Sequence, residues 1–186
     1  MLEYIKYIDT QWFLAINNGL QNSVFDFVCP YLREPKFWIP LYLIAAWVAY
    51  KKFGNNALWL ILAAGILVLV SDQFSANLIK KSVMRLRPCN DPILKSQVHL
   101  LVPCGGGFSF MSAHATNHFA LAVYFGLLFK STYKWILYFT LLWAACISIS
   151  QVYVGVHYPM DIIFGGICGS LFGYFFYSFI NKKLKI

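Results

Sequence analysis

The segment Asp161–Ile180 has the sequence DIIFGGICGSLFGYFFYSFI, and its only charged residue is the aspartate at the first position. A helix that crosses the hydrocarbon core of a bilayer needs about 20 mostly apolar residues. This segment has that length and that composition, and polar residues follow it at once, beginning with Asn181-Lys182-Lys183. The segment therefore predicts a membrane-spanning helix, and it indicates the class of fold for the whole chain.

The composition of the 186-residue chain agrees with a membrane protein. Hydrophobic residues make up 60% and charged residues 12%, with a mean hydropathy of +0.62, whereas soluble domains average about 45–50% and about 25%. Four more segments are apolar over most of a span: Phe37–Tyr50, Ala57–Ile79, Ala115–Phe129 and Trp135–Ser150. We therefore expect an all-α, polytopic bundle over residues 36–181, with five membrane-spanning helices in a single domain of residues 1–186.

The first 35 residues have a different pattern. Their apolar stretches, Trp12–Ile16 and Val24–Val28, are short and are separated by Asn17-Asn18-Gly19 and Gln21-Asn22. This pattern favours one or two amphipathic helices at the membrane interface. A bundle of six spans, in which residues 1–35 also cross the membrane, is the alternative.

The net charge of +8 arises largely from lysines at the ends of apolar runs. These lysines are Lys51-Lys52, Lys130 with Lys134, and Lys182-Lys183 with Lys185. Such positions indicate cytoplasmic ends under the positive-inside rule and argue against a nucleic-acid-binding surface. The opposite ends of the same helices then lie together at the other face of the membrane. We expect a bacterial inner-membrane protein whose functional site lies at this face, toward the periplasm or cell exterior.

Three polar clusters fall at those opposite ends, and the first contains Lys80 and Arg87. A phosphate dianion needs fixed cations, and the planar guanidinium of arginine matches two phosphate oxygens. The simpler interpretation is that these side chains bind anionic lipid headgroups without specificity.

The second cluster follows Gly105-Gly106-Gly107 and ends in Ser112-Ala113-His114. Glycines permit close approach of the backbone to a ligand, and the amides at a helix start favour an anion. A flexible loop that ends in an N-cap serine would explain Ser112, but it gives no reason for His114. His114 and His118, four residues apart, also resemble a zinc pair. No glutamate or third ligand accompanies them, so we expect no metal.

The third cluster pairs His157 with Asp161. A carboxylate four residues on can reach the imidazole across one helical turn, fix its tautomer and leave the other nitrogen free to attack. An isolated ion pair at the membrane interface is the alternative. Cys89 and Cys104 enclose the long polar loop between the first two clusters. They could form a disulfide in an oxidising compartment, or remain free.

Together these clusters resemble the three motifs of the type-2 phosphatidic acid phosphatases, in order and spacing. The matching residues are Lys80 with Arg87-Pro88, Ser112-Ala113-His114, and Ser150 with His157 and Asp161. Vanadium haloperoxidases share this signature. The resemblance covers roughly residues 60–180 and implies an all-helical membrane phosphatase that needs no metal or other cofactor.

The resemblance also implies a role for each residue. His157 would attack phosphorus to form a phosphohistidine, His114 would protonate the leaving alkoxide and later act as a base, and Asp161 would orient His157. The phosphoryl oxygens would be held by Lys80, Arg87 and the region of Ser112 and Ala113. We therefore expect hydrolysis of a lipid phosphate or pyrophosphate. A lipid phosphotransferase with the same intermediate and a non-catalytic lipid-phosphate-binding homologue are the alternatives.

The chain departs from the family pattern mainly at Gln151, where the third motif has an arginine. Glutamine can donate a hydrogen bond to phosphate but carries no charge, so a contact of a class worth about 1.5–3 kcal/mol is missing. Arg85 or Lys81 could compensate, or the substrate could carry less charge. The expected partners are a lipid phosphate and membrane lipids, with no nucleic acid and no evident obligate protein partner.

Overall fold

The computed structural model describes residues 2–184, and Lys185 lies outside this range. The described chain is all-helical and contains no β-strand. Its α-helices are α1 (Leu2–Asn17), α2 (Ser23–Leu32), α3 (Ile39–Phe53), α4 (Asn56–Gln73), α5 (Lys80–Val83), α6 (Ala113–Phe129), α7 (Ile136–Tyr153) and α8 (Pro159–Leu184). Short 3-10 turns, η1 (Pro35–Trp38) and η3 (Pro88–Asn90), precede α3 and follow α5, and a π-helical segment, η2 (Phe74–Ile79), connects α4 to α5.

Three segments are long and apolar enough to span a membrane: Asn56–Asn90, α7 and α8. The other two expected spans form helices, but α3 has 15 residues and α6 has 17, at or below the usual minimum of about 17. The helical membrane fold agrees with the sequence prediction, whereas the number of five spans stays a prediction.

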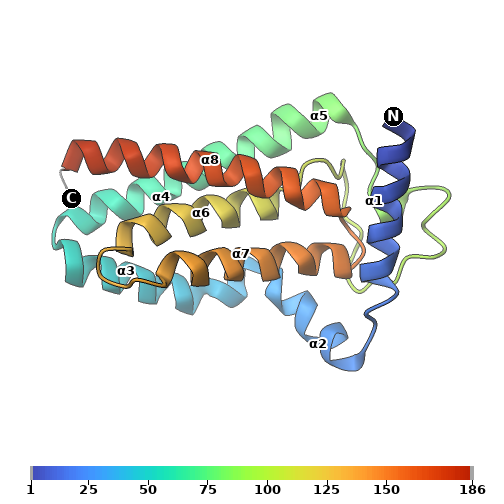
Figure 1. Cartoon of the computed structure of the whole chain (residues 1–186), viewed down its shortest axis with the longest axis horizontal. Helices are drawn as coiled ribbons and strands as arrows, with labels where there is room; N and C mark the ends of the chain where they lie inside the picture. The colour runs from blue at the N-terminus through green and yellow to red at the C-terminus, as the bar shows by residue number, and fades with distance from the viewer. Residues whose placement is uncertain (1, 185–186) are drawn as a thin grey trace.

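Helix α6 lies in the middle of the bundle and packs most closely against α8 (Figure 1). The close approach depends on Gly165, Gly169 and Gly173, which are four residues apart on α8. A Cβ atom at Gly165 would lie 2.8 Å from the carbonyl oxygen of Ser112, and one at Gly169 would overlap the backbone of Thr116. Small residues at this spacing permit helix backbones to meet in a membrane. This packing fixes the start of α6 against the start of α8.

The two ends of the bundle have different chemistry. At one end Lys52 donates to the carbonyl of Leu128 at 3.1 Å and to the Ser131 hydroxyl at 2.8 Å, so α3 and the α6–α7 turn gather there with the C-terminal end of α8 (Figure 1). At the other end α1 lies across the bundle (Figure 1). The buried side-chain amide of Asn17 joins α1 to this end by donating to the carbonyls of His99 and Tyr153 at 2.9 and 2.7 Å.

Candidate active site

The loop between α7 and α8 positions His157 at the end of the bundle covered by α1. Gly155 has φ of +89°, and a Cβ there would lie 2.6 Å from a methyl group of Val98, so the turn requires glycine. The amides of Val156 and His157 then both donate to the carbonyl of Gln151, at 3.2 and 3.3 Å. The turn therefore holds the His157 ring in a buried position.

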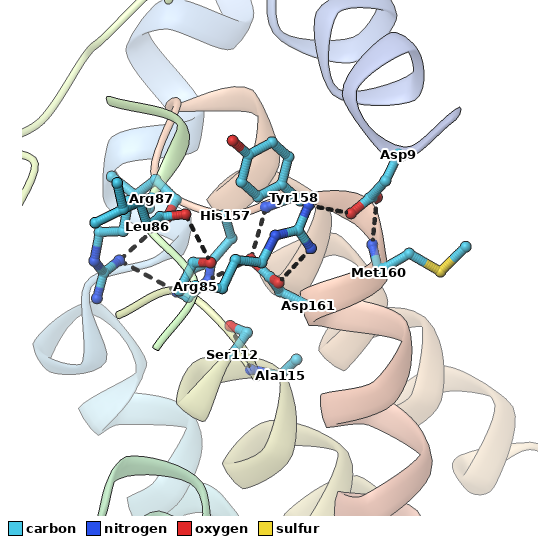
Figure 2. Close-up of polar contacts among 12 residues, drawn as sticks. Asp9, Arg85, Leu86, Arg87, Ser112, Ala115, His157, Tyr158, Met160 and Asp161 are labelled. Carbon is cyan, nitrogen blue, oxygen red and sulfur yellow. Dashed lines mark hydrogen bonds and ion pairs between the residues drawn. The ribbon is translucent and has the colours of Figure 1, made fainter. Parts of the chain in front are cut away.

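The structure places Asp161 beside His157, as the spacing predicts (Figure 2). Asp161 Oδ2 lies 3.3 Å from His157 Nδ1 and also accepts the backbone N–H of Tyr158 at 2.9 Å. When Nδ1–H donates to the carboxylate, Nε2 keeps its lone pair, which is the state that a nucleophile needs. Burial lowers the pKa of His157 from 6.5 to about 4, against the opposing effect of Asp161. The imidazole is therefore neutral at pH 7.

Arg87 lies on the free side of the His157 ring. Its Nη1 donates to the carbonyl of Val156 at 3.2 Å and lies 3.4 Å from His157 Nε2. Lys80, the first residue of α5, is half-buried, and its charge acts on both Arg87 and His157. No ion pair within residues 2–184 neutralises either cation. A phosphoryl group in front of Nε2 would meet both positive charges.

The segment before α6 is hydrogen-bonded to the other two clusters. Ser109 donates its N–H to the Arg85 carbonyl at 2.8 Å, and Ser112 donates its N–H to the Asp161 carbonyl at 3.0 Å. The Ser112 hydroxyl accepts from the amide of Ala115 as the N-cap of α6, although the bond is long at 3.4 Å. The amides of Ala113 and His114 have no partner among the described residues. They are free donors at a helix N-terminus, where an anion is favoured.

His114 presents a half-buried ring without a side-chain hydrogen bond to any described residue. Its ring stacks parallel to that of His118, with centroids 6.3 Å apart. His118 Nδ1 contacts the His114 carbonyl at 2.8 Å, and the His118 ring packs against Trp143. His118 is therefore a packing residue beside His114. The ring of His114 remains available to a ligand.

Arg85 does not replace the charge missing at Gln151. Its Nη2 lies 2.7 Å from Asp9 and its Nη1 lies 3.1 Å from Asp161, while the guanidinium stacks 3.7 Å from the centre of the Tyr158 ring (Figure 2). Arg85 thus pairs with two carboxylates, and it contacts Asp161 through Oδ1, whereas His157 contacts Oδ2. The idea that Arg85 compensates for the glutamine is therefore wrong. Lys81 makes no ion pair within the described chain.

Asp9 is the site residue that the sequence analysis missed. This carboxylate is 1% exposed, and besides pairing with Arg85 it accepts the backbone N–H of Met160 at 2.8 Å, in the first turn of α8. The sequence around it, Tyr7-Ile8-Asp9-Thr10-Gln11, offers no signal that separates Asp9 from the other polar residues of α1. Its partners lie about 76 and 151 positions away, which no local pattern shows.

The long loop before α6 contains a disulfide between Cys89 and Cys104, so the structure supports the paired alternative. Within residues 2–184, no group of three or more histidine, cysteine, aspartate or glutamate side chains is placed to hold a metal ion. Membrane-length helices define an integral membrane protein, and Lys80 and Arg87 give one end of its bundle a positive charge beside His157.

The chain belongs to the PAP2 superfamily, whose family model matches residues 54–185. It is 34% identical over 187 residues to a lipid A 4'-phosphatase of Bacteroides thetaiotaomicron, covering 99% of this chain and 81% of that protein. It is 30% identical to a lipid A 4'-phosphatase of Porphyromonas gingivalis, covering 95% and 75%. The family resemblance inferred from the three motifs is thereby confirmed.

The fold is also similar to a solved structure. The crystal structure of a transmembrane PAP2 type phosphatidylglycerolphosphate phosphatase from Bacillus subtilis superimposes with a TM-score of 0.74 at 20% identity. The match covers 96% of this chain and 87% of that one. It extends over α1 and α2, which lie before residue 54 and so outside the family model.

Proposed function

We propose that the protein is a membrane lipid phosphatase that transfers phosphate to water through a phosphohistidine at His157. The observation that carries the proposal is the position of the His157 ring. Its Nδ1 lies against Asp161 while its Nε2 faces the guanidinium of Arg87. This geometry leaves the lone pair of Nε2 next to the cation that would hold a phosphoryl oxygen.

In the first step the Nε2 lone pair forms a bond to phosphorus as the bond from phosphorus to the lipid oxygen breaks. The leaving alkoxide takes a proton from His114, whose ring has no other hydrogen-bond partner among the described residues. A bound phosphate dianion favours protonation of this imidazole before the step. Asp161 stabilises the positive charge that develops on His157, and Lys80, Arg87 and the free α6 amides stabilise the oxygens.

In the second step water attacks phosphorus and the bond to Nε2 breaks. His114, now neutral, takes a proton from the water, and inorganic phosphate leaves. The same two steps with a lipid hydroxyl in place of water describe the transferase alternative, so the identity of the acceptor distinguishes the two activities. Because side-chain cations supply the charge in both steps, we expect EDTA to leave turnover unchanged.

An apolar cavity beside the site supports a lipid substrate. The cavity has a volume of about 490 Å³ between α6, α7 and α8 and is lined by side chains such as Phe119, Ile149 and Ile167. Ile162, the residue after Asp161, also lines it, so an acyl chain could enter the cavity while the headgroup occupies the site. The names of the two lipid A 4'-phosphatases make lipid A phosphates the first substrates to test.

The same observations favour a site on the periplasmic face of a bacterial inner membrane. The lysine-rich helix ends lie opposite the site, as the positive-inside rule requires for that orientation. The Cys89–Cys104 disulfide belongs to the site end of the protein, and disulfides persist in oxidising compartments.

The test is phosphate release by the detergent-purified protein from a panel of lipid A, phosphatidylglycerophosphate, phosphatidate and undecaprenyl pyrophosphate. We expect turnover of at least one lipid, and we expect His157→Ala and His114→Ala each to lower it by at least 10³-fold, the order seen when a nucleophile or its proton donor is removed. His99→Ala is the matched control, because His99 pairs with Asp26 outside the site. Near-normal turnover by His157→Ala would contradict the mechanism.

A further inference from the structure

The pocket contains polar groups that no described residue satisfies. Gln151 is 0% exposed, and neither the oxygen nor the nitrogen of its side-chain amide has a hydrogen-bond partner. The Nε of Arg87 is also buried without a partner. Buried polar atoms without partners are rare in folded proteins, because each costs about 1–3 kcal/mol. Both residues adjoin His157: the Gln151 carbonyl accepts its backbone N–H, and Arg87 Nη1 lies 3.4 Å from its Nε2. A polar ligand in front of His157 could therefore give partners to atoms of both residues.

A third arginine, Arg33, approaches this pocket from outside the region matched by the family model. It follows α2 directly as the C-cap residue, and its backbone N–H donates to the carbonyls of Cys29 and Tyr31. Cys29 packs in a buried cluster with Tyr153, Val154 and Val156. This contact places the C-terminal half of α2 against the end of α7 and the loop that leads to His157.

Aromatic rings join the segment after Arg33 to His114. Trp38 donates its indole N–H to the Leu32 carbonyl at 2.8 Å, which fixes the chain on both sides of Arg33. The Trp38 ring contacts Trp143 with centroids 5.6 Å apart, and Trp143 contacts His118, on which His114 stacks. The end of α2 is thereby held on the His114 side of the pocket.

The side chain of Arg33 is half-buried, and the carboxylate of its neighbour Glu34 acts on its charge without forming an ion pair with it. Its Nε is buried without a partner, and no carboxylate within residues 2–184 forms an ion pair with it. Arg85 differs in this respect, because Asp9 and Asp161 both contact it. Arg33 is also close enough for its charge to act on Arg87 and His114.

The charge of Arg87 is opposed by those of Lys80 and Arg33. The carboxylate that lies nearest to His157, Asp161, is shared between His157 and Arg85. Like charges that are close together are unfavourable at low dielectric. A bound oxyanion with two negative charges would relieve this repulsion, and it would give partners to the buried guanidinium N–H groups.

We propose that Arg33 is a substrate-binding residue whose guanidinium binds an oxygen of the substrate phosphate and so supplies the positive charge that Gln151 lacks. The assignment rests on the proposed function of the site. It makes the N-terminal segment before residue 54 part of the phosphate pocket. The competing outcome is that Arg33 only attracts anionic headgroups of the surrounding bilayer.

The experiment measures binding of inorganic phosphate and of vanadate to the full chain in neutral detergent by calorimetry, together with phosphate release from the best lipid of the panel. Arg33→Met keeps the aliphatic stem and removes the charge. It should weaken phosphate binding and lower kcat/KM by about 10- to 100-fold, the range for loss of one charge-assisted contact. The matched control is Lys36→Met, an exposed cation on η1, which should change both by less than about twofold.

Moving the charge gives the sharpest comparison. Gln151→Arg in the Arg33→Met background should restore most of the lost phosphate affinity, because the guanidinium returns to the same pocket from α7. Arg33→Lys keeps a charge without the planar fork and should lose several-fold. It also provides the measurement if the methionine variant does not fold. Normal phosphate affinity in both Arg33 variants, or equal effects of Arg33→Met and Lys36→Met, would overturn the assignment.

Binding and turnover separate this assignment from the proposed function. Arg33-dependent phosphate binding without release from any lipid would support the assignment and contradict the phosphatase. Lipid turnover that is indifferent to Arg33 would support the phosphatase and reject the assignment. Neither phosphate binding nor turnover by the wild-type chain would reject both.

Discussion

Asp9 offers the most informative perturbation, because it connects the N-terminal helix α1 to Arg85 and to the first turn of α8. The carboxylate lies 2.7 Å from the Nη2 of Arg85 and accepts the N–H of Met160 at 2.8 Å. Asp9→Asn keeps an acceptor for Met160 but removes the charge, whereas Asp9→Ala removes both. The pair of variants therefore distinguishes the ion pair from the helix-capping contact.

The expected loss of stability in these variants follows from the exposure and the remaining contacts of Arg85. Breaking a fully buried ion pair costs about 3–5 kcal/mol, but the side chain of Arg85 is 22% exposed and keeps Asp161 as a second partner. We therefore expect Asp9→Asn to lower the free energy of unfolding by about 1.5–3 kcal/mol. Asp9→Ala should lose about 1 kcal/mol more, the usual value of a capping contact at a helix start.

Turnover should also fall in Asp9→Asn, by about 10- to 100-fold, a range typical of groups that orient a reacting residue. Without Asp9, both arms of the Arg85 guanidinium can turn toward Asp161 and compete with His157 for the carboxylate. KM should change little, because Arg85 does not face the phosphate pocket.

The assay is thermal unfolding in detergent, followed by tryptophan fluorescence, with phosphate release measured on the same samples. Glu3→Gln is the control, because Glu3 is a carboxylate on the same helix. Its side chain is 86% exposed and pairs with exposed Lys6. The reasoning is refuted if Asp9→Asn matches Glu3→Gln in both stability and kcat.

Three further predictions concern pH, packing and the disulfide. The pKa of His157 is about 4 in the folded protein against 6.5 in the unfolded chain, so between these pH values the unfolded chain binds more protons. The free energy of unfolding should therefore fall by on the order of 3 kcal/mol as the pH is lowered from 6.5 to 4. Chemical unfolding at several pH values should show this loss, and His157→Ala should reduce it. Gly169→Ala should lower the free energy of unfolding by about 1–3 kcal/mol in a thermal melt, because the added methyl overlaps the α6 backbone. The control Gly65→Ala on α4 places its methyl in open space and should be neutral or slightly stabilising. Equal effects of the two variants would reject the packing argument. Replacing Cys89 and Cys104 by serine should cost about 3 kcal/mol, as for a closed loop of about 15 residues, and reductant should lower the Tm of the wild type but not of the double variant.

The local part of the site could be predicted from the sequence. His157 and Asp161 are four residues apart, so one helical turn brings them together, and the structure places them 3.3 Å apart. The N-cap position of Ser112 likewise follows from its place before an apolar helix. The expected apolar segments also became helices, with bounds that differ by a few residues. Ala57–Ile79, for example, became α4 extended through η2.

The contacts of the N-terminal segment could not be predicted in this way. Asp9 and Asn17 contact partners far along the chain. Their positions, and that of Arg33, depend on how α1 and α2 pack against the end of the bundle. Sequence spacing carries no information about such contacts. The orientation of Arg85 could not be predicted for the same reason, because its guanidinium contacts Asp9 as well as Asp161.

The central claim is that His157 forms a covalent bond to phosphorus, and rapid-quench trapping tests it most directly. The purified protein is mixed with a lipid A substrate that carries ³²P in its 4'-phosphate, denatured in alkali within milliseconds, digested and analysed by mass spectrometry. The account predicts acid-labile, alkali-stable label on the peptide that contains His157. The label should increase in His114→Ala if hydrolysis of the phosphohistidine is slowed more than its formation. It should be absent in Asp161→Asn and His157→Ala. Label on another residue, or steady hydrolysis of this substrate with no label on His157 at any quench time, would contradict it.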